Sequence, residues 1–323
     1  PALREAVAAD LARRLGVTVD PGLILVVPGG KVTMFFAVLM FGEAGAEILH
    51  PDPGFPIYES VIRFSGATPV SIPLRAADGF AFSAEAVLSR ITPRTRLIIL
   101  NSPANPTGGV TPRAEIDALV AGLTRHPGVA ILSDEIYDQM LYDGREHASL
   151  LQYPEIRDRL ILLNGWSKTY AMTGWRLGYA VWPRELIEGA TRLAINCHSC
   201  VNAAAQYAGI AALTGPQDEA RAMVEAFAER RKVVLEELSA IPELSCAEPG
   251  GAFYAFPNVS RLGLTAKELE VALLEEAGVA TVAGTSFGRH GEGFLRLSYA
   301  NSIPNIREAL RRMRTWLAER AAA

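Results

Sequence analysis

The sequence predicts an α/β protein built on a mostly parallel, doubly wound sheet, and two patterns carry this prediction. Short apolar runs alternate along the chain with longer stretches of helical periodicity. The runs are continuously apolar, as in LIIL at 97–100, which is typical of strands buried on both faces of a parallel sheet. Strands of this kind between helices define the α/β class. The strand candidates are residues 23–27, 46–50, 68–72, 97–100, 129–132 and 160–163.

We expect two domains, because a chain of 323 residues exceeds the size that one hydrophobic core usually serves. A long helical pattern runs from 217 to 240, and hairpin-like segments follow it at 250–256, 279–282 and 294–299. We therefore predict a large domain over residues 1–225 and a smaller α+β domain over 226–323. A helical pattern begins almost at Pro1, so we also expect that an N-terminal segment precedes this sequence.

Composition excludes several classes of protein. A net charge of −4 and a pI near 5.8 give no basis for nucleic acid as the main partner. Three cysteines make no disulfide framework, and Cys197 and Cys200 lack a second pair at zinc spacing, so we interpret them as helix packing and expect no metal. No secretory signal opens the chain, and the longest apolar run, 32–41, is too short to span a bilayer. We expect a cytoplasmic protein without a membrane partner.

Polar residues follow the strand candidates directly, at 29–31, 101–108, 134–137 and 164–168. Ligands of open parallel sheets bind beyond the carboxyl ends of the strands, so these segments should converge on one site. The turn of Gly29, Gly30 and Lys31 precedes a helix, and its free amides suit a phosphate. Simple turn chemistry is the alternative, because neither a Walker A loop nor a G-x-G-x-x-G signature is present.

Three charged groups suggest chemistry at this site. Lys168 follows an apolar strand in a glycine-containing turn, where a depressed pKa would favour imine formation; a solvated surface lysine is the alternative. Asp134 ends a strand, and local capping is its alternative role. Arg296 lies in an apolar alternating strand, so it needs an anion, which is either a ligand or a structural carboxylate.

Four motifs together resemble the class I aminotransferases, which are pyridoxal-phosphate (PLP) enzymes of fold type I. They occur in the order and approximate spacing of that family, and the resemblance, closest to the bacterial aspartate aminotransferase subgroup, covers the chain from Leu3 onward. The S-K-T-x-A-M-T-G-W-R-x-G run is the most specific of them. The motifs are N-S-P-A-N-P-T-G at 101–108, S-D-E-I-Y at 133–137, S-K-T-Y-A-M-T-G-W-R-L-G at 167–178 and F-L-R-L-S-Y at 294–299.

The resemblance implies a role for each residue of the predicted site. Lys168 would bind PLP as a Schiff base and act as general base and acid, and Asp134 would pair with the pyridinium nitrogen. The remaining roles are ring-phenolate hydrogen bonds from Tyr137 and Asn105, ring stacking by Phe55, phosphate binding by Arg176, Gly30, Lys31 and Ser167, and substrate carboxylate binding by Arg296 with Asn105. The resemblance also implies a large PLP-binding domain over 1–225 and a homodimer.

Departures from the family pattern and open alternatives accompany the resemblance. Phe55 stands where many relatives have tryptophan or tyrosine, and Gly165 where some have a phosphate-binding serine. The family carries an N-terminal segment ahead of the point where this sequence starts. Lys31 follows the Gly-Gly pair, as in the aspartate aminotransferase subgroup, so we predict amino transfer between aspartate or glutamate and a 2-oxo acid. A PLP-dependent β-lyase is the main alternative, and a PLP-binding regulator domain is a remote one.

Overall fold

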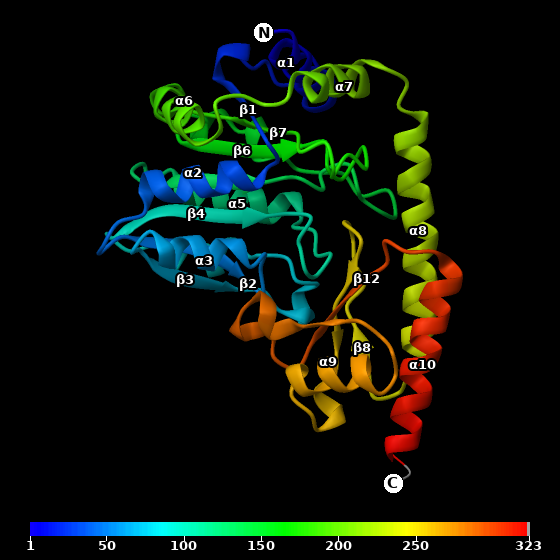
Figure 1. The fold of residues 1–323 in the computed structure, drawn as a ribbon. Helices are drawn as coiled ribbons and strands as arrows, with labels where there is room; N and C mark the ends of the chain where they lie inside the picture. The colour runs from blue at the N-terminus through cyan, green and yellow to red at the C-terminus, as the bar shows by residue number, and fades with distance from the viewer. Residues whose placement is uncertain (322–323) are drawn as a thin grey trace.

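A seven-stranded sheet forms the centre of the computed structural model, which describes residues 1–321 (Figure 1). The strands lie in the order β1-β7-β6-β5-β4-β2-β3. Strand β7 runs antiparallel to both of its neighbours, and the remaining pairs are parallel. The bounds are β1 Ile24–Val27, β2 Glu47–Asp52, β3 Thr68–Pro73, β4 Thr95–Asn101, β5 Ala130–Asp134, β6 Leu160–Gly165 and β7 Gly178–Val181.

The predicted fold class is confirmed, and each of the six strand candidates forms a strand of this sheet. Most of them extend one or two residues beyond the apolar run, because ladder bonds continue into the polar residues at the strand ends. Strand β7 was not predicted. It is four residues long, begins at a glycine and follows a polar motif, so it carries little periodic signal.

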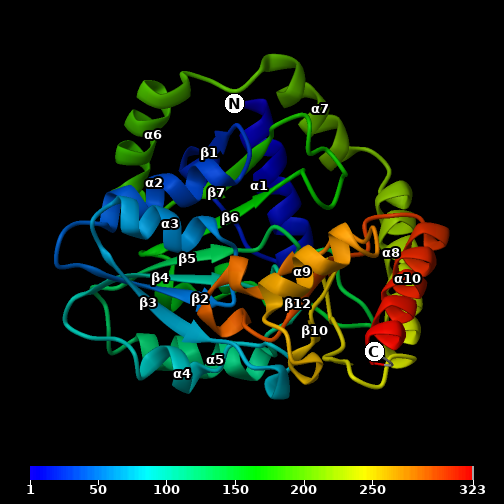
Figure 2. The same ribbon diagram turned by 60° about the horizontal axis from the view of Figure 1, so that its bottom comes forward.

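Helices cover both faces of the sheet, as Figure 2 shows for α2 and α3 on one side and α4 and α5 on the other. Successive residues of β4 point to opposite faces, so Ile98 and Leu100 join one apolar core while Leu97 and Ile99 join a second. The helix bounds are α1 Ala2–Leu15, α2 Lys31–Phe41, α3 Ile57–Phe64, α4 Ala84–Leu88, α5 Arg113–Leu123, α6 Arg184–His198 and α7 Ala203–Thr214. Burial on both faces explains why the strands are apolar throughout.

The C-terminal part begins with the long helix α8, Asp218–Ser239, which runs beside α10 in Figure 1. It has its own apolar core, formed by these helices and a three-stranded sheet of order β11-β12-β9. The other bounds are β8 Ser245–Cys246, β9 Tyr254–Ala255, β10 Pro257–Asn258, α9 Ala266–Glu275, β11 Val282–Ala283, β12 Leu295–Ser298 and α10 Ile303–Ala321. The predicted boundary at 225/226 lies inside α8, and the domain division stays a prediction.

Two segments singled out in the sequence, the cysteines at 197 and 200 and the apolar run 32–41, can be located in the structure. Cys197 lies in the last turn of α6, and both it and Cys200 are exposed, so the interpretation that they serve helix packing is wrong. The apolar run 32–41 forms α2, with Phe36 and Val38 fully buried against the sheet. Among the helices of residues 1–321, none combines the length and apolarity that a membrane crossing requires.

Candidate active site

A cavity of about 270 Å³ opens at the carboxyl ends of the parallel strands, close in size to the smallest ligand pockets, about 300 Å³. All ten residues of the predicted site line it: Gly30, Lys31, Phe55, Asn105, Asp134, Tyr137, Ser167, Lys168, Arg176 and Arg296. Nine of them come from the large predicted domain, and Arg296 comes from strand β12 of the small one. The fold thus brings together residues that are up to 266 positions apart.

Asp134 ends strand β5 and is buried in the floor of the cavity. Its Oδ2 accepts a hydrogen bond of 2.6 Å from the hydroxyl of Tyr58, and its Oδ1 accepts one of 3.3 Å from the amide of Ile136. Burial raises the pKa of Asp134 to about 6, although both hydrogen bonds and the charge of Lys168 oppose the rise. Asp134 is therefore a carboxylate held in an apolar setting that would gain from a cationic partner.

Replacing Tyr58 with phenylalanine should raise the pKa of Asp134 above its value of about 6. The hydroxyl donates to the ionised carboxylate, so its loss disfavours ionisation by about one pKa unit, the worth of one such bond. Carbon-13 NMR of the Asp134 carboxyl group in the ligand-free protein would measure the shift. Equal titration midpoints in wild type and variant would show that this hydroxyl does not stabilise the carboxylate.

Lys168 follows strand β6 and projects between two aromatic rings. Its Nζ lies 5.5 Å from the ring centroid of Tyr137 and 5.2 Å from that of Phe253. Burial lowers the pKa of Lys168, and the nearby cations Arg296, Lys31 and Arg176 lower it further, while Asp134 opposes them. A lysine with a lowered pKa is a better nucleophile at neutral pH, because more of it is unprotonated.

Arg296 reaches the cavity from the small domain with an incomplete set of hydrogen bonds. Its guanidinium carbon lies 4.9 Å from the ring centroid of Tyr254 and 4.7 Å from that of Phe287. Its Nη1 donates to Oδ1 of Asn105 at 3.4 Å, whereas its buried Nε has no partner. No carboxylate lies within ion-pair distance of this guanidinium among the described residues. The unpartnered Nε therefore favours an anionic ligand over a structural carboxylate as the partner of Arg296.

The cationic end of the cavity is the part lined by Gly30, Lys31 and Arg176. Gly30 caps α2 without any side-chain cap, which leaves the helix N-terminus open to an anion. Gly29 has φ +91°, and a Cβ atom there would lie 2.2 Å from Nη2 of Arg176. The glycine is required on both grounds, because a side chain would be strained and would displace the guanidinium.

Gly165 departs from the family pattern for a steric reason. It ends strand β6 opposite Gly178 of β7. A Cβ atom on Gly165 would lie 2.9 Å from the Cα of Gly178 and 3.0 Å from the carbonyl oxygen of Leu177. A serine cannot stand here without moving the neighbouring strand, so Ser167, which lines the cavity, is the nearby hydroxyl that can replace it.

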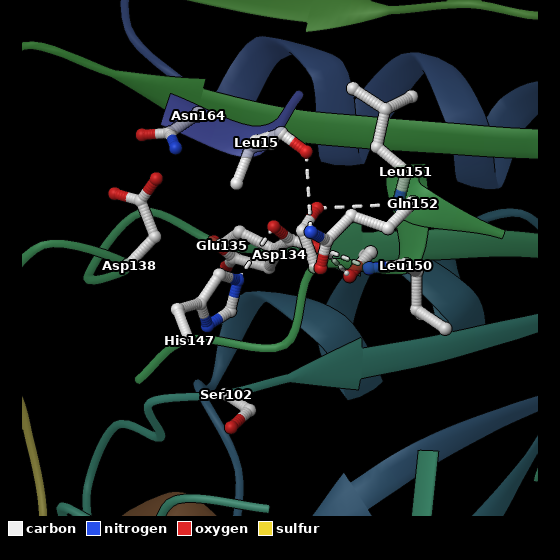
Figure 3. A network of polar contacts seen from close by, with 12 residues as sticks. Leu15, Ser102, Asp134, Glu135, Asp138, His147, Leu150, Leu151, Gln152 and Asn164 are labelled. Carbon is white, nitrogen blue, oxygen red and sulfur yellow. Dashed lines mark hydrogen bonds and ion pairs between the residues drawn. The ribbon is translucent and has the colours of Figure 1, made fainter. Parts of the chain in front are cut away.

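Buried charges anchor the loop that follows strand β5, and Figure 3 shows Glu135 and His147 among them. Glu135 accepts hydrogen bonds from Ser133, from the amide of Leu150 and from Nε2 of His147, the last at 2.7 Å. Burial lowers the pKa of His147, but the Glu135 carboxylate outweighs it, so the pKa is raised above its ordinary 6.5. Residues 134 and 137 thus face the cavity, while Glu135 fixes the loop from behind.

Replacing Glu135 with glutamine should lower the free energy of unfolding by about 3 kcal/mol at pH 6, as expected when one partner of a buried ion pair is removed. Because folding raises the pKa of His147, the ion pair contributes its full share of the unfolding free energy below pH 6.5. That share is lost as the pH rises through the pKa of His147 in the folded state. Urea unfolding at pH 6 and pH 9 should therefore give a smaller difference at pH 9. Glu59→Gln, which breaks a surface pair with Arg63, is the control and should cost less than about 1 kcal/mol. An equal effect at both pH values would contradict the ion-pair assignment.

Sequence reasoning missed two tyrosines of the site. Tyr58 lies on the buried face of α3 and Tyr254 on strand β9, where its hydroxyl lies 2.9 Å from that of Tyr137. Both occupy positions where an aromatic residue predicts core packing. The only available signal was their placement near the Pro- and Gly-rich turns at 51–56 and 249–251.

Comparisons with known proteins agree with this geometry. The family model for aminotransferase class I and II matches residues 1–313. An aspartate aminotransferase of Geobacillus stearothermophilus is 37% identical over 99% of this chain and 82% of its own length. The structure of Thermus thermophilus aspartate aminotransferase with maleate has a TM-score of 0.91 at 37% identity, covering 98% of this chain and 81% of that one. An aromatic aminotransferase from Pyrococcus horikoshii OT3 reaches 0.96 at 34% identity, covering 100% and 87%.

The chain belongs to the class I and II aminotransferases. It is a PLP-dependent transaminase of fold type I that moves an amino group between an amino acid and a 2-oxo acid. Amino-group transfer, the predicted activity, is thereby confirmed. The residues present fit the cofactor, since the cavity joins a lysine of lowered pKa, a buried carboxylate and an open cationic end.

Proposed function

We propose that this transaminase acts on dicarboxylates, aspartate or glutamate with 2-oxoglutarate or oxaloacetate. One observation carries the proposal: two cations, Arg296 and Lys31, line the same cavity as Lys168 and come from different parts of the fold. The guanidinium, with its unpartnered Nε, suits the α-carboxylate, which every amino acid has. The Lys31 ammonium, held 5.0 Å above the ring of Phe55, suits a second carboxylate. Several related proteins are named aspartate aminotransferases.

The cofactor supplies the electron sink when it is bound, and we propose that five residues hold its ring and carbonyl. Lys168 would hold the carbonyl carbon through a covalent bond from its Nζ, with the carbonyl oxygen leaving as water. Asp134 keeps a proton on the ring nitrogen, since a buried carboxylate gains from an adjacent cation. Phe55 stacks on the ring face, and Tyr137 and Asn105 donate hydrogen bonds to the ring oxygen. Oδ1 of Asn105 accepts from Arg296, so its amide nitrogen is the atom available for this donation.

The phosphate occupies the cationic end in this proposal. The backbone amides of Gly30 and Lys31 at the N-terminus of α2, the guanidinium of Arg176 and the hydroxyl of Ser167 bind it. Lys168 would also move the reacting proton: as a free amine its Nζ would accept the proton from the substrate Cα, and as an ammonium it would be the proton donor. The lowered pKa of Lys168 supports this role, because a base must be unprotonated before it accepts a proton.

Incubating the PLP-loaded protein with L-aspartate and 2-oxoglutarate should produce oxaloacetate and glutamate. Lys31→Gln should raise the KM for aspartate about tenfold, the effect of about 1.4 kcal/mol of lost binding. The KM for L-alanine, which has no distal carboxylate, should not change in the same variant. A Lys31 variant that affects both substrates equally, or neither, would remove this lysine from the distal site.

A homodimer and a cytoplasmic location complete the proposal. A second copy would bury the exposed side chains of Trp175, which directly precedes Arg176, and of Tyr207, at 51% and 75%, and aromatic side chains are enriched at protein interfaces. Amino acid and 2-oxo acid substrates are the small-molecule partners.

A further inference from the structure

Asp52 is a buried carboxylate outside the cavity that connects the two parts of the chain. It ends strand β2, and its side chain is only 2% exposed. Its one side-chain partner within the large predicted domain is the hydroxyl of Ser71, at 3.0 Å. A buried carboxylate needs more than one neutral donor, so its other partners matter.

Those partners come from the segment 284–291, the two short 3-10 helices that precede β12. The amide of His290 donates to Oδ1 of Asp52 at 3.0 Å, and Nδ1 of His290 lies 2.9 Å from Oδ2. Gly288 passes so close that a Cβ atom would lie 2.1 Å from Oδ1, and its φ of +127° favours glycine. Figures 1 and 2 both show this orange segment against the end of β2.

The same contact fixes residues of the active site on both sides. On the large-domain side, Asp52 lies three positions before Phe55, and the amide of Gly54 donates to the carbonyl of Phe287 at 2.7 Å. On the small-domain side, the ring of Phe287 lies 4.7 Å from the guanidinium of Arg296, for which it forms one wall. Asp52, Gly54 and His290 therefore set where Phe287 stands relative to the cavity.

We infer that Asp52 is a positioning residue for substrate binding, which acts through His290 and Phe287 on the guanidinium of Arg296. This inference rests on the proposed role of Arg296 as the α-carboxylate site. The rings of Tyr254 and Phe287 orient the guanidinium of Arg296, which has one unpartnered N–H donor. A shift of Phe287 would therefore change the direction in which this donor points. Lys168 and Asp134, the residues proposed to bind the cofactor carbonyl and ring nitrogen, form no hydrogen bond or ion pair with Asp52, so the absorption band of bound PLP should be unaffected.

Asp52→Asn in the PLP-loaded protein tests the inference. Calorimetric titration with maleate, an unreactive dicarboxylate, should give a dissociation constant about tenfold higher than in wild type, the effect of one lost charge-assisted hydrogen bond. KM for the amino acid should rise similarly, with kcat and the absorption band of bound PLP nearly unchanged. The control is Glu47→Gln, a buried carboxylate at the other end of β2 that bonds to Thr92 and Arg94. It should lower the melting temperature and leave maleate binding unchanged.

Gly288→Ala tests the same contact from the other side and serves if Asp52→Asn does not fold. It should raise the dissociation constant for maleate by a similar factor. The double variant should raise it by less than the product of the two single factors, because both substitutions break the same contact between Asp52 and the segment 284–291. Unchanged maleate binding and KM in both variants, or parallel loss of PLP and maleate, would overturn the inference. If the wild-type protein does not bind maleate, the dicarboxylate assignment is wrong. The role of Asp52 is then tested by comparing, between wild type and variant, the KM for an amino acid that the wild type converts.

Discussion

Replacing Lys168 with alanine should lower kcat about 10⁴-fold, the upper range for a positioned acid–base group. The substitution removes both proposed functions of the side chain, the covalent bond to the cofactor and the transfer of the reacting proton. Absorption spectroscopy after dialysis should show that PLP is no longer retained covalently. Turnover should be measured with saturating PLP, so that weak cofactor binding does not explain the loss.

Two control variants distinguish loss of the amine from loss of a cation. Lys168→Arg keeps the charge but has no nucleophilic amine, since a guanidinium stays protonated. It should be nearly as inactive as the alanine variant. Lys31→Ala removes a cation from the same cavity and should retain covalent PLP. A Lys168→Ala protein that retains wild-type turnover or covalent PLP would refute the assignment of this lysine.

The fold was predictable where the periodic signal is strong. The parallel strands are buried on both faces, so their apolar runs stand out from the helices between them. Strand β7 could not be found this way, because Gly178–Val181 is short and pairs antiparallel through long-range contacts. The boundary between the predicted domains is similarly weak, since α8 continues across it without a break.

The candidate site was predictable to the extent that it consists of polar residues at strand ends. Lys168, Asp134 and Arg296 are costly in apolar surroundings, so the sequence itself marks them. Tyr58 and Tyr254 are equally close to the chemistry, but an aromatic residue on a buried face also suits a core. Asp52 was missed for another reason: its partner His290 lies 238 positions away, and local sequence contains no record of that contact.

Replacing Asp134 with asparagine should lower kcat roughly 10²–10³-fold, the usual cost of removing one preorganised electrostatic partner. The amide fills the same space and can still bond to the hydroxyl of Tyr58, but it does not hold a proton on the ring nitrogen. Steady-state kinetics with saturating PLP would measure the loss. A variant with nearly full activity would show that the carboxylate is not needed at this position.

The same substitution should stabilise the ligand-free protein, because the burial that suits Asp134 to its proposed role costs stability when no cofactor is bound. Burial raises its pKa from 3.8 to about 6, so the folded state holds this proton more tightly than the unfolded state. Wild type therefore loses stability as the pH rises from 3.8 through about 6, and the penalty is complete at pH 7. Asp134→Asn should gain roughly 3 kcal/mol of unfolding free energy at pH 7.5 and about 1 kcal/mol at pH 4.5.

Asp138→Asn, four residues further along the same loop, should change stability in the opposite direction. Asp138 is also buried, but its Oδ2 lies 2.8 Å from Nη1 of Arg14 on helix α1. Loss of that charge leaves Arg14 with Asp10 alone and should cost about 3 kcal/mol, as for the Glu135–His147 pair. Denaturant unfolding of the ligand-free variants would decide between the two outcomes. A destabilised Asp134→Asn protein at pH 7.5 would mean that this carboxylate is satisfied without its cofactor.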